Sequence, residues 1–479
     1  MLFLVISTPA PTRPSEVRDQ RKKYWPWIQD KLDSGLARSV YPRTGRGAVV
    51  VFDVDSHETL HRLLNEWADL IPAEFGIYPL MEPASIKTFL DDDSGECPIA
   101  NRRMKYHVRE RLRHTVKRSE PEAHIVNEDL AGKVQTVLGP IEPERLGVTL
   151  THEHLLVDLS VAHGPPQTAS GMGFYHAPVS METLGRIRHH GASNGDNAQL
   201  FDVATAIEEV MLFKQHGGNS MLEATSIGIG RDPSGLYRIS NATGVNIIMG
   251  ASYYVADAHP SGMDRWTEDD IAEQVVRDVT EGVDGTGIRS GVIGEIGCSW
   301  PLADNERKVL RASARAQRMT GAPILIHPGR DEISPLQIIE VLAEAGADLS
   351  RTIMGHLDRT VFLRDTLTKI AEAGCYMEWD LFGTENSYYT LNPKIDMPSD
   401  AKRMDDIAWI SSQGYGRKVL VAHDICAKHR LEKYGGHGYY YILSHIVPRM
   451  RARGFTGEAI DDILVNNPRD SLTFVEPEA

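Results

Sequence analysis

The sequence predicts an α/β protein in which a (β/α)8 barrel follows a small α+β domain. Two observations predict this organisation. After residue 132, eight short apolar runs alternate with longer segments of helical periodicity, and before residue 90 a shorter strand and helix rhythm is present. We therefore divide the 479 residues into a first domain (1–90), a charged linker (91–131) and a barrel (132–479).

The first 90 residues alternate between strand and helix patterns. Apolar runs predict strands at 1–7, 47–54 and 75–81, and segments with helical periodicity predict helices at 14–35 and 55–70. The first helix is expected despite Pro26, and the second has Asp55 or Ser56 as its N-cap candidate. Strand, helix, strand, helix, strand is a ferredoxin-like rhythm.

Residues 91–131 are polar and rich in both charges, with Lys and Arg concentrated between Arg102 and Arg118. A nucleic-acid-binding patch is one interpretation of this stretch. We favour a linker or a solvated helix, because the rest of the chain is acidic.

The barrel segment carries eight apolar runs that predict strands. They lie at 147–154, 219–225, 245–252, 291–297, 322–328, 351–357, 375–381 and 418–424. Most are separated by segments with helical periodicity, and eight such repeats over roughly 340 residues are typical of a TIM barrel. A doubly wound open sheet is the alternative, but it would carry a Gly-rich phosphate loop after its first strand, and none is present there.

Two histidines stand one residue apart in the first of these runs, "GVTLTHEH". Alternate side chains of a strand point to the same face, so His152 and His154 point together and Glu153 points away. Two adjacent imidazoles make half of a metal site. Alone, the pattern is weak, because two polar residues can end a strand by chance.

Further ionisable residues end other predicted strands. They are Glu295 in the fourth run, His327 in the fifth, His356 in the sixth and Asp424 in the eighth. Strand ends of a barrel meet at one rim, so these side chains converge with the histidine pair. Each could singly be a satisfied core or capping residue. Six together favour metal ligation, because unpaired ionisable groups are costly to bury.

Six ligands exceed what one zinc with an open position requires, so we expect two divalent metal ions. His152, His154 and Asp424 would hold one metal, His327 and His356 the other. Glu295 would bridge them. A water between two such cations loses its proton near neutral pH and becomes a nucleophile, and Asp424 would orient it and accept its proton. Zn²⁺ suits this ligand set best, while Mn²⁺ or Co²⁺ would also fit.

Long stretches of residues 132–479 resemble the phosphotriesterase family of the amidohydrolase superfamily, and within it the phosphotriesterase-related proteins. The resembling stretches include "GVTLTHEHLL", "GVIGEIGCSWPLADNERKVL", "PILIHPGR", "GHLDRT" and "VLVAHDICAKHRLEKYGGHGYYYILSHIVPRM". The resemblance implies a binuclear divalent centre, usually zinc, on the six residues named above. The founding phosphotriesterases bridge their metals with a carboxylated lysine, where this sequence has Glu295. That departure counts against phosphotriester hydrolysis as the main activity.

The amino-terminal segment resembles muconolactone isomerase-like domains, on "MLFLV" and "GAVVVFDVDSHETLHRLLNEWADLIPAEFGIYPLMEP". These are small ferredoxin-like units that oligomerise. The resemblance implies an oligomerisation or pocket-capping role, and we find no set of catalytic residues to transfer.

Several residues near the strand ends are candidates for substrate binding. Arg330 and Arg359 follow two of the ligand histidines by three residues and could hold an anionic group, although surface ion pairs would explain them equally well. Asp358 is a candidate to orient a ligand histidine. The other candidates are Tyr253, Tyr254, Glu378, Lys428, His429 and Tyr434.

Composition restricts the partners and the compartment. The formal net charge of −15 argues against nucleic acid or an anionic membrane as a partner. No apolar run approaches the roughly 18 residues that span a bilayer, and the first residues lack the basic region of a signal peptide. Four scattered cysteines favour a reducing compartment, so we expect a cytoplasmic protein. The resemblances above imply in addition a homo-oligomer and a small-molecule substrate.

These features predict a binuclear metal-dependent hydrolase in which a metal-bridging hydroxide attacks a lactone, ester or amide carbonyl. Three alternatives remain. One is phosphotriester hydrolysis at the same metals. The second is a non-catalytic binding protein that retains a metallated barrel. The third is a bifunctional fusion in which an isomerase domain passes an enol-lactone to the hydrolase.

Overall fold

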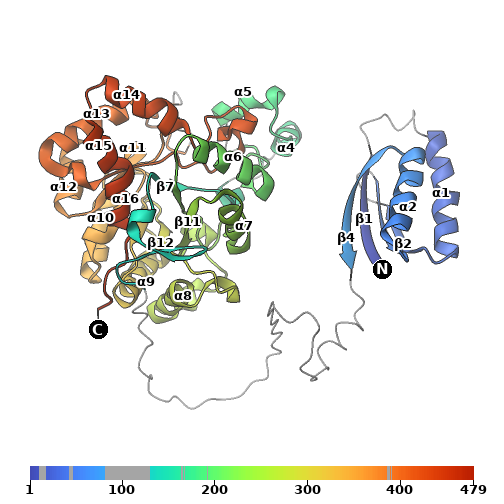
Figure 1. Ribbon diagram of the computed structural model, residues 1–479. Helices are drawn as coiled ribbons and strands as arrows, with labels where there is room; N and C mark the ends of the chain where they lie inside the picture. Colours follow the sequence, from blue (N-terminus) through green and yellow to red (C-terminus); the bar gives the residue numbers. More distant parts are fainter. Residues whose placement is uncertain are drawn as a thin grey trace, which may run out of the picture. The chain divides into compact units, whose positions relative to one another are not determined.

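The computed structural model describes residues 1–9, 18–42, 47–80, 130–162, 166, 168–190, 193–385, 389 and 391–478. The chain divides into two compact units, Met1–Ser119 and Glu120–Ala479 (Figure 1). The predicted linker at 91–131 lies outside the described residues except for its last two positions. Its boundaries therefore stay predictions.

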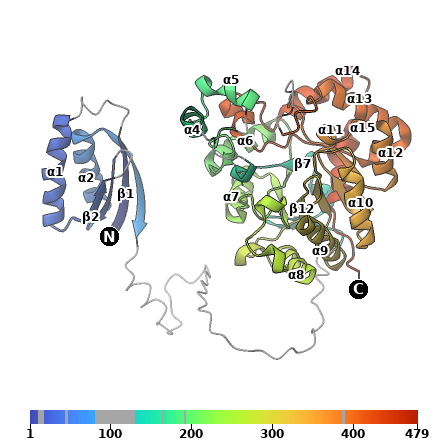
Figure 2. The same ribbon diagram turned by 180° about the vertical axis from the view of Figure 1, so that it is seen from behind.

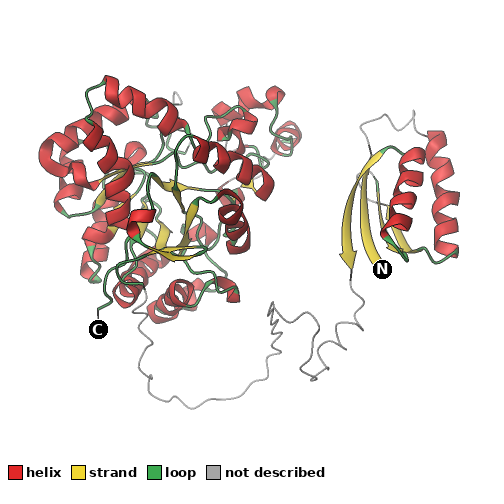
Figure 3. Ribbon diagram, viewed as in Figure 1, coloured by secondary structure: helices red, strands yellow, loops and turns green. Residues whose placement is uncertain are grey.

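The first unit is a four-stranded antiparallel sheet with two helices on one face (Figure 3). Its elements are β1 (Leu2–Pro9), α1 (Arg18–Asp33), β2 (Ala37–Pro42), β3 (Ala48–Asp53), α2 (His57–Leu70) and β4 (Ala73–Leu80). The strand order is β2-β3-β1-β4. Trp67 of α2 lies at the centre of the core and contacts the rings of Tyr24, Phe52 and Phe75. The small α+β domain predicted from the sequence is present.

One strand of this unit, β2, was not predicted from the sequence. Of the two N-cap candidates for α2, Ser56 is the cap, because its hydroxyl accepts a hydrogen bond from the backbone N–H of Thr59. Helix α1 passes through Pro26, as expected.

The second unit is an eight-stranded parallel barrel surrounded by helices (Figures 1 and 2). The strands are β7 (Thr149–Glu153), β10 (Ser220–Glu223), β11 (Asn246–Ala251), β12 (Val292–Gly297), β13 (Ile324–His327), β14 (Thr352–Met354), β15 (Tyr376–Trp379) and β16 (Val419–Val421). They pair in chain order, and the backbone N–H of Asp424 donates to the carbonyl of His152 at 3.1 Å, where the first and last strands meet. Each of the eight predicted runs forms one of these strands.

Helices follow the strands and cover the outside of the barrel. The main ones are α6 (Val203–Gln215), α7 (Pro233–Thr243), α8 (Glu268–Thr280), α9 (Asp304–Thr320), α10 (Ser334–Glu344), α12 (Arg364–Glu372) and α13 (Asp400–Ile410). Short helices stand before and after them: α4 (Ala169–Tyr175), α5 (Met181–His190), α11 (Leu357–Thr360), α14 (Val447–Ala452), α15 (Gly457–Asp461) and α16 (Asn467–Leu472). Four short strands form two small ribbons, β5 (Val134–Thr136) with β6 (Gly139–Ile141) and β8 (Val157–Asp158) with β9 (Gln199–Leu200). No helix of the described part is long and apolar enough to cross a membrane.

Alternation along the strands separates two apolar cores and positions the polar rim. Met377 and Val421 belong to the large core beneath the helices, while Leu325, Tyr376 and Leu420 belong to a second core inside the barrel. His327 lies two residues after Leu325 on the same face of β13, and Glu378 lies two residues after Tyr376 on the same face of β15. The face that is apolar lower in the barrel therefore becomes polar at the carboxyl ends of the strands.

Candidate metal centre

Glu295 on β12 lies at the centre of four histidines. Its Oε2 is 3.4 Å from His152 Nε2, 3.0 Å from His327 Nδ1 and 3.5 Å from His356 Nε2. Its Oε1 is 3.3 Å from His154 Nε2. One carboxylate thus reaches all four imidazoles predicted as ligands, with one oxygen toward three of them and the other toward the fourth.

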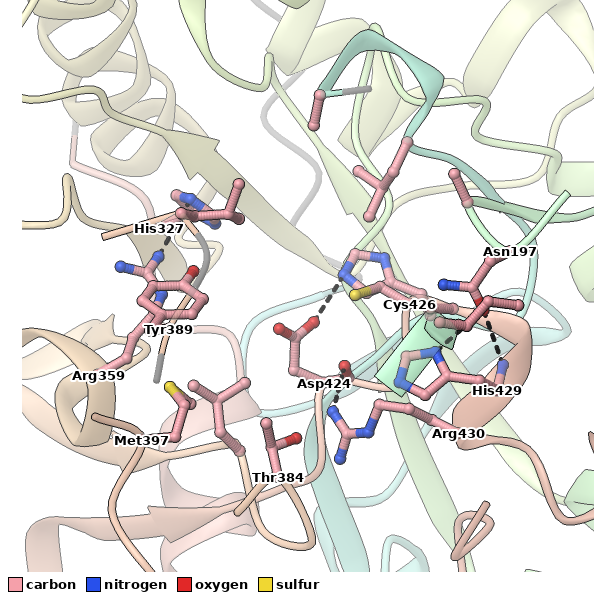
Figure 4. A pocket seen from close by; sticks show the side chains of 18 of the residues that line it. Asn197, His327, Arg359, Thr384, Tyr389, Met397, Asp424, Cys426, His429 and Arg430 are labelled. Atoms are coloured by element: carbon pink, nitrogen blue, oxygen red, sulfur yellow. Dashed lines mark hydrogen bonds and ion pairs between the residues drawn. The ribbon is translucent and has the colours of Figure 1, made fainter. Parts of the chain in front are cut away.

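Asp424 lies beside the two histidines of β7 and its end. Its Oδ1 lies 3.3 Å from His154 Nε2, and its side chain is 15% exposed while those of the other five residues are almost fully buried. His152, His154 and Asp424 form one group whose donor atoms are close enough to hold a metal ion. Asp424 is also the member of the six that faces the cavity most openly (Figure 4).

His327 and His356 lie together beside Glu295, and His356 forms a second possible metal-binding group with His152 and Glu295. His356 Nε2 lies 2.9 Å from His327 Nδ1, and both nitrogens face Glu295 Oε2. His356, like Asp424, has a positive φ, at 54° and 51° respectively. Non-glycine residues rarely adopt this left-handed conformation, and when they do the strain often marks a functional site.

The donor set fits divalent cations. Imidazole nitrogens and carboxylate oxygens are the ligands that zinc and its neighbours prefer, and here they converge on Glu295. The buried Nε2 of His152 has no hydrogen-bond partner among the described residues, although it points toward Glu295. Burying an imidazole nitrogen without a hydrogen-bond partner is costly, and a bound metal ion would offset that cost.

Two carboxylates of β15 and its end fix the histidine rings. Glu378 Oε2 lies 3.1 Å and Asp380 Oδ2 lies 3.3 Å from His152 Nδ1. Asp380 also lies 2.8 Å from His356 Nδ1 and accepts the backbone N–H of His356 at 2.7 Å. Because these partners hold the Nδ1 atoms, the Nε2 atoms of both rings are directed to Glu295.

A hydroxyl plays the same role for His154. Thr225 Oγ1 lies 2.8 Å from His154 Nδ1 and donates its own proton to Glu223 Oε1 at 2.6 Å. Neither residue was predicted from the sequence. Glu153, which points away from the centre as the alternation requires, accepts the backbone N–H groups of His423 and Ile425 and so anchors the segment that carries Asp424.

Charge in the buried centre is distributed unevenly among its carboxylates. Burial alone would raise the pKa of Glu295, but His327, His152 and His154 outweigh burial and hold the pKa well below its usual range. In the same way, His356 and His152 overcome burial and lower the pKa of Asp380 to about 2. Burial dominates at Glu378 and raises its pKa to about 7. Glu295 and Asp380 therefore carry the negative charge that faces the histidines.

The centre forms the floor of a cavity of about 200 Å³. Four of the residues predicted to bind substrate line this cavity: Tyr254, Arg330, Arg359 and His429. The Tyr254 hydroxyl lies 3.4 Å from His327 Nδ1, and Arg359 Nη2 lies 3.2 Å from His327 Nε2. Figure 4 shows Asp424 between a wall containing His327, Arg359 and Tyr389 and a wall containing Asn197, His429 and Arg430.

The other four predicted substrate residues lie elsewhere around the site. Tyr253 is buried with its ring against His259 and Trp266, and Glu378 lies beneath His152. Lys428 and Tyr434 line a neighbouring cavity, where Lys428 pairs with Asp196 at 2.6 Å. Asp358 binds Arg403 at 2.7 Å and the backbone N–H of Leu381 at 3.0 Å, not a ligand histidine.

Comparison with known proteins relates both units to families. Residues 132–472 match the phosphotriesterase family, and residues 1–92 match a domain of unknown function (DUF3303). The N-acetyltaurine hydrolases of Xenopus tropicalis and Homo sapiens are 48% and 47% identical to this chain over 346 residues, which are 72% of this chain and 99% of each relative.

Solved structures agree with this assignment. A resiniferatoxin-binding protein from Rhodobacter sphaeroides is 37% identical, with a TM-score of 0.69 over 71% of this chain and 95% of that structure. The phosphotriesterase homology protein of Escherichia coli, complexed with phosphate in its active site, is 27% identical, with a TM-score of 0.56 over 68% and 98%. The lactonase Lmo2620 from Listeria monocytogenes is 26% identical, with a TM-score of 0.58 over 71% and 99%. The match over residues 132–472, the relatives covered over nearly their whole length and the shared barrel show that this chain belongs to the phosphotriesterase family of hydrolases.

Proposed function

We propose that this protein is a binuclear metal-dependent amidase that hydrolyses a small N-acyl compound. The observation that carries the proposal is the convergence of four histidines on Glu295, within 3.0–3.5 Å, on the floor of a cavity that Asp424 also lines. His152, His154 and Asp424 would hold one ion. His327 and His356 would hold the second, and Glu295 would bridge the two.

Two bound divalent cations would supply an activated water and polarise the scissile carbonyl. The protein's own part is acid–base chemistry and orientation. Asp424, the most exposed of the six, would accept the proton of the attacking water on Oδ2 and pass it to the leaving amine. The other oxygen of Asp424, Oδ1, lies 3.3 Å from His154 Nε2, and both atoms would face the same ion.

The relatives favour an amide over the other substrates. The curated relatives at 44–48% identity are named N-acetyltaurine hydrolases, and N-acetyltaurine is an acetamide of an amino sulfonate. The lactonase is similar at 26% identity. A lactone is therefore the second candidate, and the Glu295 bridge still counts against phosphotriesters. Zn²⁺ is the proposed metal, with Mn²⁺ or Co²⁺ able to use the same ligands. Assembly as a homo-oligomer and a cytoplasmic location stay predictions.

A panel of hydrolysis assays tests the proposal. Zinc-loaded protein is offered N-acyl amides, lactones, simple esters and a phosphotriester, with Asp424→Asn as the matched variant. We expect turnover of an amide and a loss of about 10²–10⁴-fold in kcat for Asp424→Asn, the usual contribution of a general base. Metal content of both proteins, measured by atomic emission, separates loss of the base from loss of the ions. Normal turnover by Asp424→Asn with two metals bound would contradict the mechanism, and turnover of lactones alone would contradict the amide assignment.

A further inference from the structure

The cavity above the metal centre is rich in arginine. Arg188, Arg330, Arg359 and Arg430 line it, while Glu295 and Asp424 are its carboxylates among the described lining residues. Both carboxylates belong to the proposed metal centre. The wall above the centre is thus cationic in a chain whose formal net charge is −15. Such a reversal of sign in a concave site favours an anionic ligand.

Three of the four arginines are committed to protein carbonyls. Arg430 donates to the carbonyls of His423, Asp424 and Phe382 at 2.7, 3.1 and 2.9 Å, and so holds the segment of Asp424. Arg188 donates to Gly435 at 2.8 Å. Arg359 donates to the carbonyl of Pro328 at 3.2 Å and to Thr360 Oγ1 at 3.1 Å.

Arg330 differs from the other three. Its Nε donates to the hydroxyl of Tyr389 at 2.8 Å, and its guanidinium carbon lies 5.7 Å from the centre of that ring. Its two terminal nitrogens have no hydrogen-bond or ion-pair partner within the described part of the chain, although the side chain is half-buried at the cavity wall. Tyr389 therefore fixes the guanidinium while leaving its bidentate edge free.

We propose that Arg330 is the residue that recognises the substrate, by binding a sulfonate or carboxylate group through its free edge. This inference rests on the proposed amidase function and names its substrate class: N-acyl amines that carry an anionic group. The planar guanidinium matches two oxygens of either anion, and such charge-assisted pairs are the stronger hydrogen bonds. Arg359 adds positive charge on the same wall, beside His327.

Three acetamides that share the unit CH3CONHCH2CH2 test the proposal. They end in a sulfonate, a carboxylate (N-acetyl-β-alanine) or a neutral hydroxyl (N-acetylethanolamine). We expect the wild-type protein to hydrolyse at least one anionic acetamide with a kcat/KM about 100-fold or more above that of the alcohol, the range for a partly buried charged contact. The ratio between sulfonate and carboxylate identifies which anion is preferred.

Variants separate recognition from catalysis. Arg330→Met is expected to lose about 100-fold in kcat/KM for the preferred anionic acetamide, mainly through KM, and to leave the alcohol almost unchanged. Arg330→Lys should restore part of the loss, because it keeps the charge without the planar fork. Arg311→Met, at a half-exposed arginine of α9 paired with Glu344, is the matched control. Melting temperature and metal content are measured for each variant.

The outcomes distinguish the two proposals. Hydrolysis of none of the three acetamides by metal-loaded protein would contradict the proposed amidase function. Equal hydrolysis of charged and neutral acetamides, or an equal loss on all of them in folded, metal-loaded Arg330→Met, would overturn the role of Arg330 and leave the amidase intact. Calorimetric titration of Asp424→Asn with the anionic acetamides gives a second readout, in which Arg330→Met must weaken binding.

Discussion

At the scale of single residues, the site depends on which nitrogen each histidine presents. The hydroxyl of Thr225 has one proton, and Glu223 accepts it. Thr225 Oγ1 must therefore accept from His154 Nδ1–H, so Nε2 is the nitrogen that faces Glu295 and Asp424 and would bind a metal. A neutral imidazole with a bare Nε2 is the form that binds a metal.

We predict that Thr225→Val weakens metal binding, because nothing would then fix the tautomer of His154. The expected loss of affinity is about 10–100-fold for the ion held by His152, His154 and Asp424. Competition with a chromogenic chelator measures it. Thr368→Val on α12, where the exposed hydroxyl donates to the Arg364 carbonyl far from the metal centre, is the control. Unchanged affinity in Thr225→Val would show that the hydrogen bond has no role in ligation.

A second residue-scale prediction concerns His429 on the opposite wall of the cavity. Burial, together with Arg430 and Arg188, lowers its pKa to about 3. The unfolded chain binds a proton there near pH 6.5 and the folded chain does not, so stability is complete above about pH 6.5 and falls as the pH drops toward 3.

The measurement is the free energy of unfolding of the wild type and of His429→Gln at several pH values. The wild type should lose up to about 1.4 kcal/mol per pH unit relative to the variant below pH 6.5. Parallel pH profiles for the two proteins would show that His429 is not held neutral.

The six proposed ligands were predicted from their positions at the ends of strands. The residues that hydrogen-bond to the ligand histidines could not be predicted in this way. His154 meets Thr225 across 71 residues of sequence, and His152 meets Glu378 across 226. Such pairs arise only when strands far apart in the sequence meet in the barrel, β7 beside β10 in the first case and β7 across β16 from β15 in the second, and no local pattern marks them. Lys428 and Tyr434 were predicted to bind substrate, but the segment after β16 places them at the neighbouring cavity. Their position in the sequence alone does not indicate which cavity they line.

At the scale of elements, the barrel strands were predictable because both of their faces are buried. Their apolar runs are short, continuous and bounded by polar or glycine residues. Strand β2 was missed for the opposite reason. It is an edge strand with the sequence "ARSVYP", and most of its residues are half-buried or exposed, so neither alternation nor an apolar run marks it.

One glycine of β12 illustrates how tightly these elements pack around the centre. A Cβ at Gly297 would lie 2.1 Å from the backbone nitrogen of Val255 and 2.4 Å from the carbonyl carbon of Tyr254. Backbone atoms cannot rotate out of the way as a flexible side chain can, so Gly297→Ala should shift the whole segment after β11, which positions Tyr254 at the cavity. We predict a loss of about 1–3 kcal/mol of unfolding free energy, as for other overpacked sites, and reduced turnover.

Denaturant unfolding of Gly297→Ala measures that loss, with Gly185→Ala as the control. Gly185 lies in helix α5 with open space around its missing Cβ, and alanine there should be neutral or stabilising by up to about 1 kcal/mol. Equal unfolding free energies of the two variants would contradict the prediction, because the backbone at Val255 would then shift without a cost in stability.

At the scale of the whole molecule, each unit has what it needs to fold. The first has its own core around Trp67, Phe52 and Leu63, and the barrel has separate inner and outer cores. All six proposed ligands and every described residue lining the cavity belong to the second unit. The second unit therefore supplies every residue that the proposed chemistry uses.

We predict that a protein lacking residues 1–125 folds, binds the same metals and hydrolyses the preferred acetamide with unchanged kcat and KM. Three roles remain open for the first domain: an organiser of assembly, a cap over the pocket or a partner enzyme. Sedimentation of both proteins tests assembly, and assays of an enol-lactone with both proteins test the partner enzyme. A full-length chain that associates while the truncated chain does not would assign assembly to the first domain. A fall in acetamide turnover on truncation, with folding and metal content preserved, would instead mean that the first domain contributes to the active site.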